Sequence, residues 1–212
     1  MKPKAIFFDV DGTIIPLKVV VKTFQETCRH FNIKVLSNKK LLDTIVGYKL
    51  EEVIPKIIPE AISIEKEFIR CFEDYQIKNF KKYGKLLPHV KSIFREIKRR
   101  KIKIGIVTTK KRSEALAILR GYKLFYDTLV GHDDVKKRKP SPEPTLKACK
   151  NLKVKPKDCI FVGDHPFDML SAKGAGCFAI GVLTGWGTTY KLKRAGADHI
   201  IKDLRGLKEL IE

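Results

Sequence analysis

The sequence lacks the apolar run of about 18–20 residues that a membrane-spanning helix requires. Before Asp9, the longest apolar run is residues 5–8, which is too short for the core of a signal peptide. None of the five cysteines belongs to a Cys-x-x-Cys pair, and their odd number and wide spacing argue against a disulfide framework and a structural zinc site. We therefore expect a cytoplasmic protein, with no membrane contact and with reduced, mostly buried thiols.

Acidic residues are scarce relative to basic ones, 24 against 44, which gives a net charge of +20. Such a charge attracts nucleic acids and phosphorylated metabolites alike, so it leaves both classes of partner open. The single tryptophan, Trp186, lies between two glycines and offers little for stacking bases. The basic residues are spread in runs that we expect to attract anions at long range, at residues 98–103, 110–112, 136–139 and 150–157.

The 212 residues fit one domain, or a core with one inserted subdomain, and 43% of them are hydrophobic, which is enough to build a core and excludes disorder. Residues 4–8 form a short apolar run that ends at Asp9, which is typical of a buried parallel strand. After residue 84, strands and helices alternate, which predicts a Rossmann-like α/β fold with a parallel sheet covered on both faces. We expect strands at residues 103–107, 125–130, 159–162, 177–182 and 197–201, and helices at 88–101, 113–120, 142–151, 167–173 and 204–211.

Between residues 16 and 83, apolar residues recur at three- and four-residue spacing, which indicates helices. We expect breaks near Gly47 and at Pro55 and Pro59, because glycine and proline interrupt helices. The sequence therefore predicts a core of residues 1–15 and 84–212, with a small helical cap, residues 16–83, inserted after the first strand.

Polar side chains follow four of the predicted strands. Since ligands bind at the carboxyl ends of parallel strands, we expect these side chains to gather on one edge of the sheet. Crowded carboxylates repel one another unless a cation lies between them, and hard oxygen ligands favour Mg²⁺. A lysine and a hydroxyl opposite that cation can hold phosphoryl oxygens, so the arrangement suits phosphoryl transfer through an aspartyl-phosphate. The residues concerned are Asp9, Asp11, Thr108, Thr109, Lys139, Asp164 and Asp168.

The segments Asp9-Val-Asp-Gly-Thr13, Thr108, Lys139 and Gly163-Asp164-x3-Asp168 resemble, in this order, the four motifs of the haloacid dehalogenase superfamily. The resemblance covers residues 4 to about 201, and the helical insertion takes the place of that family's small cap. Residues 106–110 and 139–144 are most similar to its phosphoglycolate phosphatase and cytosolic pyrophosphatase branch.

The resemblance implies that Asp9 is a nucleophile that also binds Mg²⁺. It implies that Asp11 is the general acid toward the leaving group and then the base for water, with its backbone carbonyl on the metal. A carboxylate at position 11 points to phosphate esters or anhydrides, because the family's dehalogenases lack one there.

For the remaining motif residues, the resemblance implies a phosphate-binding hydroxyl at Thr108, with Thr109 also available, and a phosphate-neutralising ammonium at Lys139. Asp164 would complete the metal site, and Asp168 would hold a metal-bound water or orient Lys139. From the residues alone, Thr108 and Asp168 could instead only cap helices.

Two further segments keep alternative interpretations. His165 lies inside the last motif, but we expect it to face solvent, because Asp11 already fills the proton-transfer role. In the cap, Gly47, Tyr48 and Lys49 are candidates for substrate specificity, and a plain turn between helices is an equal alternative.

Together these observations predict a Mg²⁺-dependent phosphatase, monomeric or homodimeric, that hydrolyses a small phosphorylated metabolite such as phosphoglycolate, pyrophosphate or a sugar phosphate. A sugar-phosphate mutase of the same family is the alternative among enzymes. A basic nucleic-acid-binding protein is the alternative of another class, and the four acids on one edge argue against it, since they would repel phosphodiesters without metal. A phosphorylation-controlled signalling domain would need no cap and would not carry its acceptor aspartate at the first strand.

Overall fold

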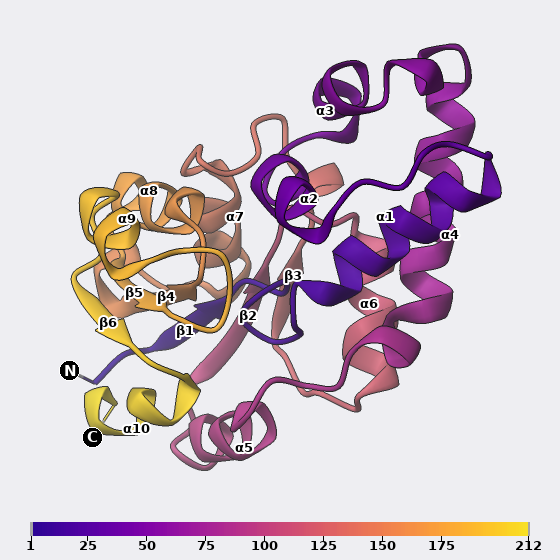
Figure 1. Cartoon of the computed structure of the whole chain (residues 1–212). Coiled ribbons are helices and arrows are strands. Elements are labelled where there is room, and N and C mark those ends of the chain that lie inside the picture. The colour runs from indigo at the N-terminus through magenta and orange to yellow at the C-terminus, as the bar shows by residue number, and fades with distance from the viewer. Residues whose placement is uncertain (1, 212) are drawn as a thin grey trace. The chain divides into compact units, whose positions relative to one another are not determined.

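The computed structural model describes residues 2–211. The chain divides into two compact units (Figure 1). The core unit contains the chain up to Pro16 and again from Leu86 onward, and the helical unit is Leu17–Lys85. Within residues 2–211, no helix combines the length and the hydropathy that crossing a membrane requires.

The core unit is built on a six-stranded sheet in the order β3-β2-β1-β4-β5-β6, with every neighbouring pair parallel. This is the order of a doubly wound Rossmann-like sheet, so the predicted fold class is confirmed. Phe8, at the end of β1, is in register with Ile106 on one side and Val162 on the other, so the residues that follow these three strands meet at one edge. The strands are β1 (Ala5–Phe8), β2 (Lys103–Val107), β3 (Thr128–Val130), β4 (Cys159–Gly163), β5 (Phe178–Val182) and β6 (His199–Ile201).

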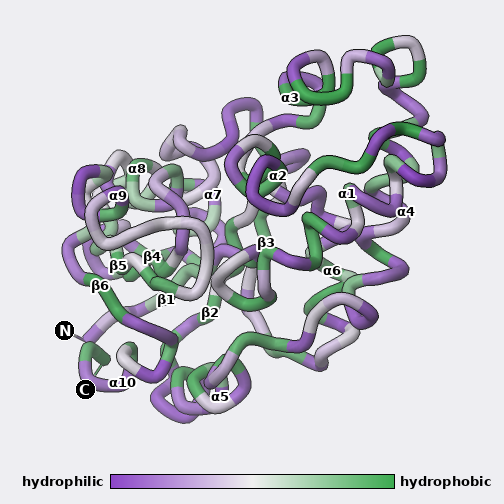
Figure 2. The backbone as a smooth tube through the Cα atoms, viewed as in Figure 1, coloured by the Kyte–Doolittle hydropathy of each residue, from purple (hydrophilic) through white to green (hydrophobic). Residues whose placement is uncertain are grey.

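Alternate residues of a strand point to opposite sides. Since all residues of β1 and β4 are buried, both faces of the sheet are covered there. Phe7 and Phe161 belong to an apolar cluster that includes Ala148 of α7. On the other face, the ring of Phe8 packs against that of Phe94 in α5 (Val90–Arg99), with the ring planes tilted by 36° and the centroids 4.9 Å apart. Figure 2 shows hydrophobic residues along the strands and a mixture of hydrophobic and hydrophilic residues along the helices. The helices of the core unit are α5 (Val90–Arg99), α6 (Arg112–Gly121), α7 (Glu143–Leu152), α8 (Pro166–Ala175), α9 (Thr189–Arg194) and α10 (Leu207–Leu210), with 3₁₀ turns at His132–Asp134, Pro156–Asp158 and Leu204–Gly206.

The helical unit is held together by aromatic packing between its first and last helices. Phe24 of α1 contacts Phe68 and Phe72 of α4, with ring centroids 5.3 Å and 6.1 Å apart. At the surface, Glu26 of α1 accepts hydrogen bonds from Asn79 and Lys82 of α4. The elements are α1 (Lys18–His30), α2 (Asn38–Ile45), α3 (Leu50–Ile57), a 3₁₀ helix at Pro59–Ile64, and α4 (Glu65–Tyr83).

The expected helix break at Pro55 is wrong, because α3 runs through this residue. Proline there removes one backbone hydrogen bond, but α3 ends two residues later, and the buried Val53 and Ile54 supply packing. All five cysteines are free, and only Cys71 is partly exposed, so the expectation of reduced, mostly buried thiols is confirmed.

Candidate active site

The ammonium of Lys139 joins two carboxylates at the carboxyl edge of the sheet. Its Nζ donates to Asp9 Oδ1 at 2.7 Å, to Asp168 Oδ1 at 2.5 Å and to the carbonyl oxygen of Val107 at 3.1 Å. Lys139 is only 3% exposed, whereas Lys136 and Lys137 of the same basic run are exposed. The loop between β3 and α7 therefore turns one lysine inward, beside the residues that follow β1 and β2.

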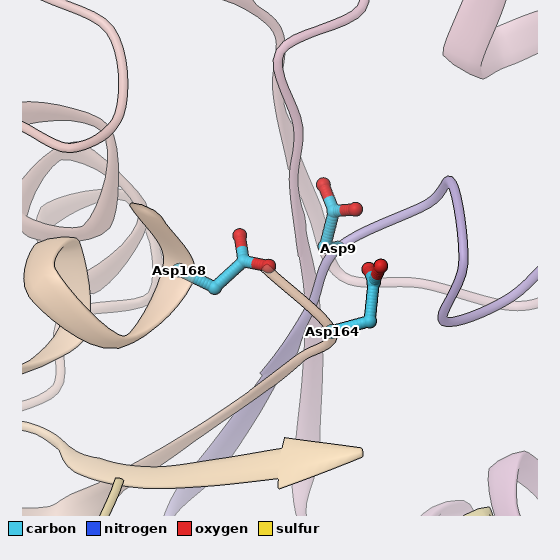
Figure 3. Close-up of side chains that lie close together, drawn as sticks. All are labelled: Asp9, Asp164 and Asp168. Atoms are coloured by element: carbon cyan, nitrogen blue, oxygen red, sulfur yellow. The ribbon is translucent and has the colours of Figure 1, made fainter. Parts of the chain in front are cut away.

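Asp164, directly after β4, is the third buried acid of this group. One carboxylate oxygen from each of Asp9, Asp164 and Asp168 lies within 4.8 Å of the others (Figure 3). The Asp164 carboxylate accepts from the hydroxyl of Thr13 at 3.2 Å and from the backbone N–H of Trp186 at 2.8 Å. Because an ionised carboxylate has about four lone-pair sites, each Asp164 oxygen keeps capacity for another partner.

Asp168 uses both oxygens within the protein. Besides the contact of Oδ1 with Lys139, its Oδ2 accepts from the backbone N–H of His165 at 2.9 Å, which caps the first turn of α8. Asp168 therefore both contacts Lys139 and caps the first turn of α8, and its role in orienting Lys139 or holding a metal-bound water stays a prediction.

Asp11 is held by a lysine whose burial the sequence did not indicate. Its Oδ2 lies 3.0 Å from Lys110 Nζ, which is also 3.7 Å from Oε2 of Glu114 on α6. Lys110 is 6% exposed, so it does not belong to the anion-attracting surface to which its basic run was assigned. Oδ1 of Asp11 is buried and has no hydrogen-bond partner among the described residues. The i, i+4 spacing of Lys110 and Glu114 is the sequence feature that could have predicted this ion pair.

The two threonines after β2 differ in burial. Thr108 is 3% exposed, its N–H donates to the carbonyl of Val130 at 3.0 Å, and its hydroxyl oxygen accepts from the N–H of Lys110 at 3.2 Å. The hydroxyl therefore closes a local turn and still carries a proton that it can donate. Thr109 is partly exposed.

The family model described as haloacid dehalogenase-like hydrolase matches residues 6–182. The chain belongs to the haloacid dehalogenase-like hydrolases. The PpaX protein of Caldanaerobacter subterraneus is 33% identical, with 100% of this chain and 96% of the relative covered. Pyrophosphatase PpaX of Bacillus mycoides is 32% identical over 86% of this chain and 84% of its own length. The crystal structure of a predicted phosphoglycolate phosphatase from Haemophilus somnus superposes with a TM-score of 0.90 at 22% identity, covering 100% of this chain and 99% of that one.

In this haloacid dehalogenase-like hydrolase, burial and neighbouring charges together shift the pKa values of the buried acids and of Lys139. Burial, and then the negative charges of Asp168 and Asp9, raise the pKa of Asp164 well above its usual range. Burial also raises the pKa of Asp9, against the opposing effect of Lys139. Burial alone would lower the pKa of Lys139, but the charges of Asp168 and Asp9 raise it above its usual value. A divalent cation beside Asp9 and Asp164 would relieve the cost of their ionised forms, so this oxygen donor set fits Mg²⁺.

His165 does not face solvent, contrary to expectation. It is 7% exposed, and its ring lies 4.6 Å from that of Phe167 and 4.9 Å from that of Trp186, measured between centroids. Its Nδ1 accepts from the N–H of Phe167, which places the proton of the neutral ring on Nε2. Burial and the nearby charge of Lys139 lower the pKa of His165 to about 4. Of these two neighbours, Trp186 comes from a loop distant in sequence, which motif spacing does not reveal.

The three candidate specificity residues lie in the helical unit, in the turn between α2 and α3. Gly47 has φ +84°, a conformation that favours glycine. Tyr48 is exposed, and the ammonium of Lys49 lies 3.8 Å from Oε1 of Glu52. The alternative of a turn between helices is thus realised, and the contact of these residues with substrate stays a prediction.

Proposed function

We propose that this hydrolase is a Mg²⁺-dependent phosphatase acting on a small phosphorylated metabolite, with inorganic pyrophosphate as the first candidate substrate. The observation that carries the proposal is the Lys139 ammonium between Asp9 and Asp168, in a buried cluster with Asp164. Pyrophosphate comes first because relatives that match most of the chain are named pyrophosphatases.

In the proposed first half-reaction, a carboxylate oxygen of Asp9 attacks phosphorus. The new O–P bond forms as the bond between phosphorus and the leaving oxygen breaks, and Asp11 gives its proton to that oxygen. In the second half-reaction, water attacks the phosphorus of the aspartyl-phosphate while Asp11 accepts a proton from the water. Inorganic phosphate leaves, and the Asp9 carboxylate is restored.

Lys139 supports this chemistry by neutralising phosphoryl oxygens and holding Asp9 in place. Thr108 would donate its hydroxyl proton to a phosphoryl oxygen, with Thr109 available beside it. Asp168 would orient Lys139, whose ammonium it contacts, or hold a metal-bound water. Mg²⁺, held by Asp9, Asp164 and the backbone carbonyl of Asp11, would reduce the charge repulsion between the nucleophile and the phosphoryl group.

We assign the helical unit, Leu17–Lys85, the role of a cap that excludes water and selects the leaving group. Within this unit, α1 and α4 pack on each other through Phe24, Phe68 and Phe72. The turn at residues 47–49 supplies the candidate contacts. The choice among pyrophosphate, phosphoglycolate and a sugar phosphate would depend on this unit rather than on the common acids of the core.

The test is phosphate release from pyrophosphate, phosphoglycolate and a panel of sugar phosphates, with Mg²⁺ and with a chelator. The wild type should release phosphate only with Mg²⁺. Asp9→Asn keeps the side-chain shape and removes the attacking charge, so turnover should fall by at least about a thousandfold. The matched control is Asp43→Asn, at an exposed acid of α2, which should retain wild-type activity.

Turnover by Asp9→Asn near the wild-type rate, after mass spectrometry has excluded reversion, would show that Asp9 is not the nucleophile. Conversion of a sugar phosphate to its isomer without release of phosphate would show that the enzyme is a mutase.

A further inference from the structure

The hydroxyl of Ser171, in the middle of α8, is buried and donates a hydrogen bond outside its own helix. Its Oγ donates to the carbonyl oxygen of Ser141 at 2.8 Å, in the loop between β3 and α7. Ser171 Oγ also lies 2.8 Å from Oγ1 of Thr145 in α7. Because a serine hydroxyl has one proton, Thr145 is the donor in this second contact. The proton of Ser171 is therefore committed to the loop.

A serine is an unusual residue for this position if it serves only the helix. Serine has a lower helix propensity than alanine, and inside a helix its hydroxyl commonly faces solvent or bonds to the carbonyl four residues earlier. Burying a hydroxyl also costs free energy unless the group is hydrogen-bonded. Ser171 uses its proton on another segment of the chain, which indicates a role in joining α8 to the loop.

The same face of α8 also holds the side chain of Lys139. Asp168 precedes Ser171 by three residues, and residues at this spacing are neighbours on one helix face. Asp168 accepts from the ammonium of Lys139 at 2.5 Å, while Ser171 donates to the backbone two residues after Lys139. One turn of α8 therefore contacts both the end of this side chain and the segment that carries it.

Hydrogen bonds within the loop connect Lys139 to the point where Ser171 is attached. Two backbone N–H groups near the start of the loop donate to the carboxylate of Glu143, at 2.8 and 2.9 Å. The N–H of Ser141 donates to the carbonyl of Arg138 at 3.0 Å, so Lys139 lies inside a closed turn. A displacement of Ser141 would therefore move Lys139, and with it the hydrogen bond from Lys139 to Asp9.

We propose that Ser171 is a positioning residue, which holds the loop so that the Lys139 ammonium stays between Asp9 and Asp168. Without the Ser171 hydroxyl, the carbonyl of Ser141 would lose this donor, and the loop would open more often. The consequence for catalysis rests on the proposed function, which assigns Lys139 to the phosphoryl oxygens and to Asp9. The placement of the ammonium can be measured without catalysis.

Two variants separate this role from a general contribution to stability. Ser171→Ala removes the bond to Ser141. Thr145→Val nearly keeps the side-chain shape and removes the other bond of the Ser171 hydroxyl, but it leaves the bond to Ser141, so it is the matched control. Thr145 and Ser171 are both 0% exposed, and urea unfolding should show similar losses of stability for the two variants.

The first experiment follows the Lys139 ammonium by NMR in the full-length chain with Mg²⁺. A buried, hydrogen-bonded ammonium exchanges its protons with water slowly, and Lys139→Met identifies the signal by its loss. Ser171→Ala should speed this exchange by about tenfold, as expected for the loss of one hydrogen bond, whereas Thr145→Val should not. The buried ammonium of Lys110 is an internal control that should exchange at its wild-type rate in both variants. Unchanged exchange of Lys139 in Ser171→Ala, or equal acceleration of Lys110 and Lys139, would overturn the proposal.

The second experiment measures steady-state kinetics on the substrate that the wild type hydrolyses best, well below the unfolding transition of both variants. The kcat of Ser171→Ala should fall by about ten- to a hundredfold, the loss expected when a catalytic group is displaced by about 1 Å. KM should change less, because the placement of Asp9 matters more for attack than for binding. Thr145→Val should keep the wild-type kcat.

An unchanged kcat in Ser171→Ala, or an equal fall in both variants, would overturn the positioning role. If the wild type released no phosphate from any substrate, the proposed function would be wrong, and the exchange of the Lys139 ammonium would then decide by itself whether Ser171 positions this side chain.

Discussion

Lys110 is a buried cation with two carboxylates as partners. Its ammonium lies 3.0 Å from Asp11 and 3.7 Å from Glu114, and the side chains of all three residues are largely buried. Burial alone would lower the pKa of Lys110, but the charges of Asp11 and Glu114 raise it above its usual value. Lys110 therefore stays charged, and it fixes the position of the residue that we assign as the general acid and base.

Lys110→Met should destabilise the protein, because it removes the cation and leaves Asp11 and Glu114 buried without it. Breaking a buried ion pair from one side costs about 3–5 kcal/mol, and urea unfolding should show a loss of this size. Adding Glu114→Gln should recover part of it by removing one buried charge. Lys91→Met, at an exposed position of α5, is the matched control and should change stability by less than about 0.5 kcal/mol. Equal losses in the two methionine variants would contradict a stabilising role for the buried pair.

Individual residues show where sequence patterns stop being informative. The order of the acids along the chain placed Asp9, Asp164 and Asp168 after strands, and the structure brings these three together. The burial of His165 depends on Trp186, which is twenty-one residues away along the chain. The cysteines present the same difficulty: Cys149, Cys159 and Cys177 are widely spaced along the chain, yet they belong to one buried apolar cluster. Patterns within one element are visible in a sequence, whereas contacts among elements depend on how they pack.

At the scale of elements, the loop after β5 is shaped around Asp164. The N–H of Trp186 donates to the Asp164 carboxylate, and the N–H of Gly187 donates to the Asp164 carbonyl at 2.8 Å. The hydroxyl of Thr184 donates to the carbonyl of Gly12 at 2.6 Å, which joins the loop to the segment after β1. A Cβ at Gly185 would lie 1.9 Å from Asp164 Oδ2, so only glycine leaves room for this carboxylate.

Gly185→Ala should therefore displace the Asp164 carboxylate and weaken the binding of Mg²⁺. Its effect on the stability of the fold should be smaller. We expect the Mg²⁺ concentration for half-maximal activity to rise by about ten- to a hundredfold, the range for groups that orient a metal ligand. Gly174→Ala, in α8, is the matched control, since its Cβ would lie 3.3 Å from the nearest atom, a side-chain carbon of Pro142. Titration of activity against Mg²⁺ decides the matter, and superimposable curves for Gly185→Ala and the wild type would contradict the predicted role of the loop.

Strands and helices with a long hydrophobic pattern in the sequence were predicted more accurately than short ones. Strand β2 occupies residues 103–107 as predicted, because a continuous apolar run marks a strand buried on both faces. The third strand is shorter than the predicted 125–130: Phe125 is 43% exposed and lies under Lys98, whose ammonium is 4.3 Å from the ring centroid. Helix α9 was not predicted, since its six residues give less than two full turns of periodicity and contain one buried side chain, Leu192. Short edge elements depend on tertiary contacts more than on their own sequence.

For the whole molecule, the net charge of +20 is distributed over many exposed side chains, and hydrophilic segments lie along the helices of both units (Figure 2). Two of the basic side chains, Arg99 and Arg100, donate hydrogen bonds to Glu96 and lower its pKa to about 2. Since Lys110 and Lys139 are buried against carboxylates, the field that reaches solvent comes from the other basic residues. Such a field attracts any anion, and its range shortens as salt is added.

We therefore expect nucleic acid to bind weakly and without sequence preference. The single tryptophan is not a stacking platform for bases, because its ring is enclosed by His165, 4.9 Å away, and by the ammonium of Lys191, 3.5 Å from its centroid. Band-shift titration at about 150 mM salt should give a Kd of about 10⁻⁶ M or weaker for duplex and single strands, and the logarithm of the binding constant should fall linearly with the logarithm of the salt concentration. Because a small anionic substrate feels the same field, kcat/KM should also fall with salt, whereas kcat should not, since screening slows encounter more than chemistry. Sequence-selective binding tighter than about 10⁻⁸ M would contradict this expectation and would make nucleic acid a partner of the protein.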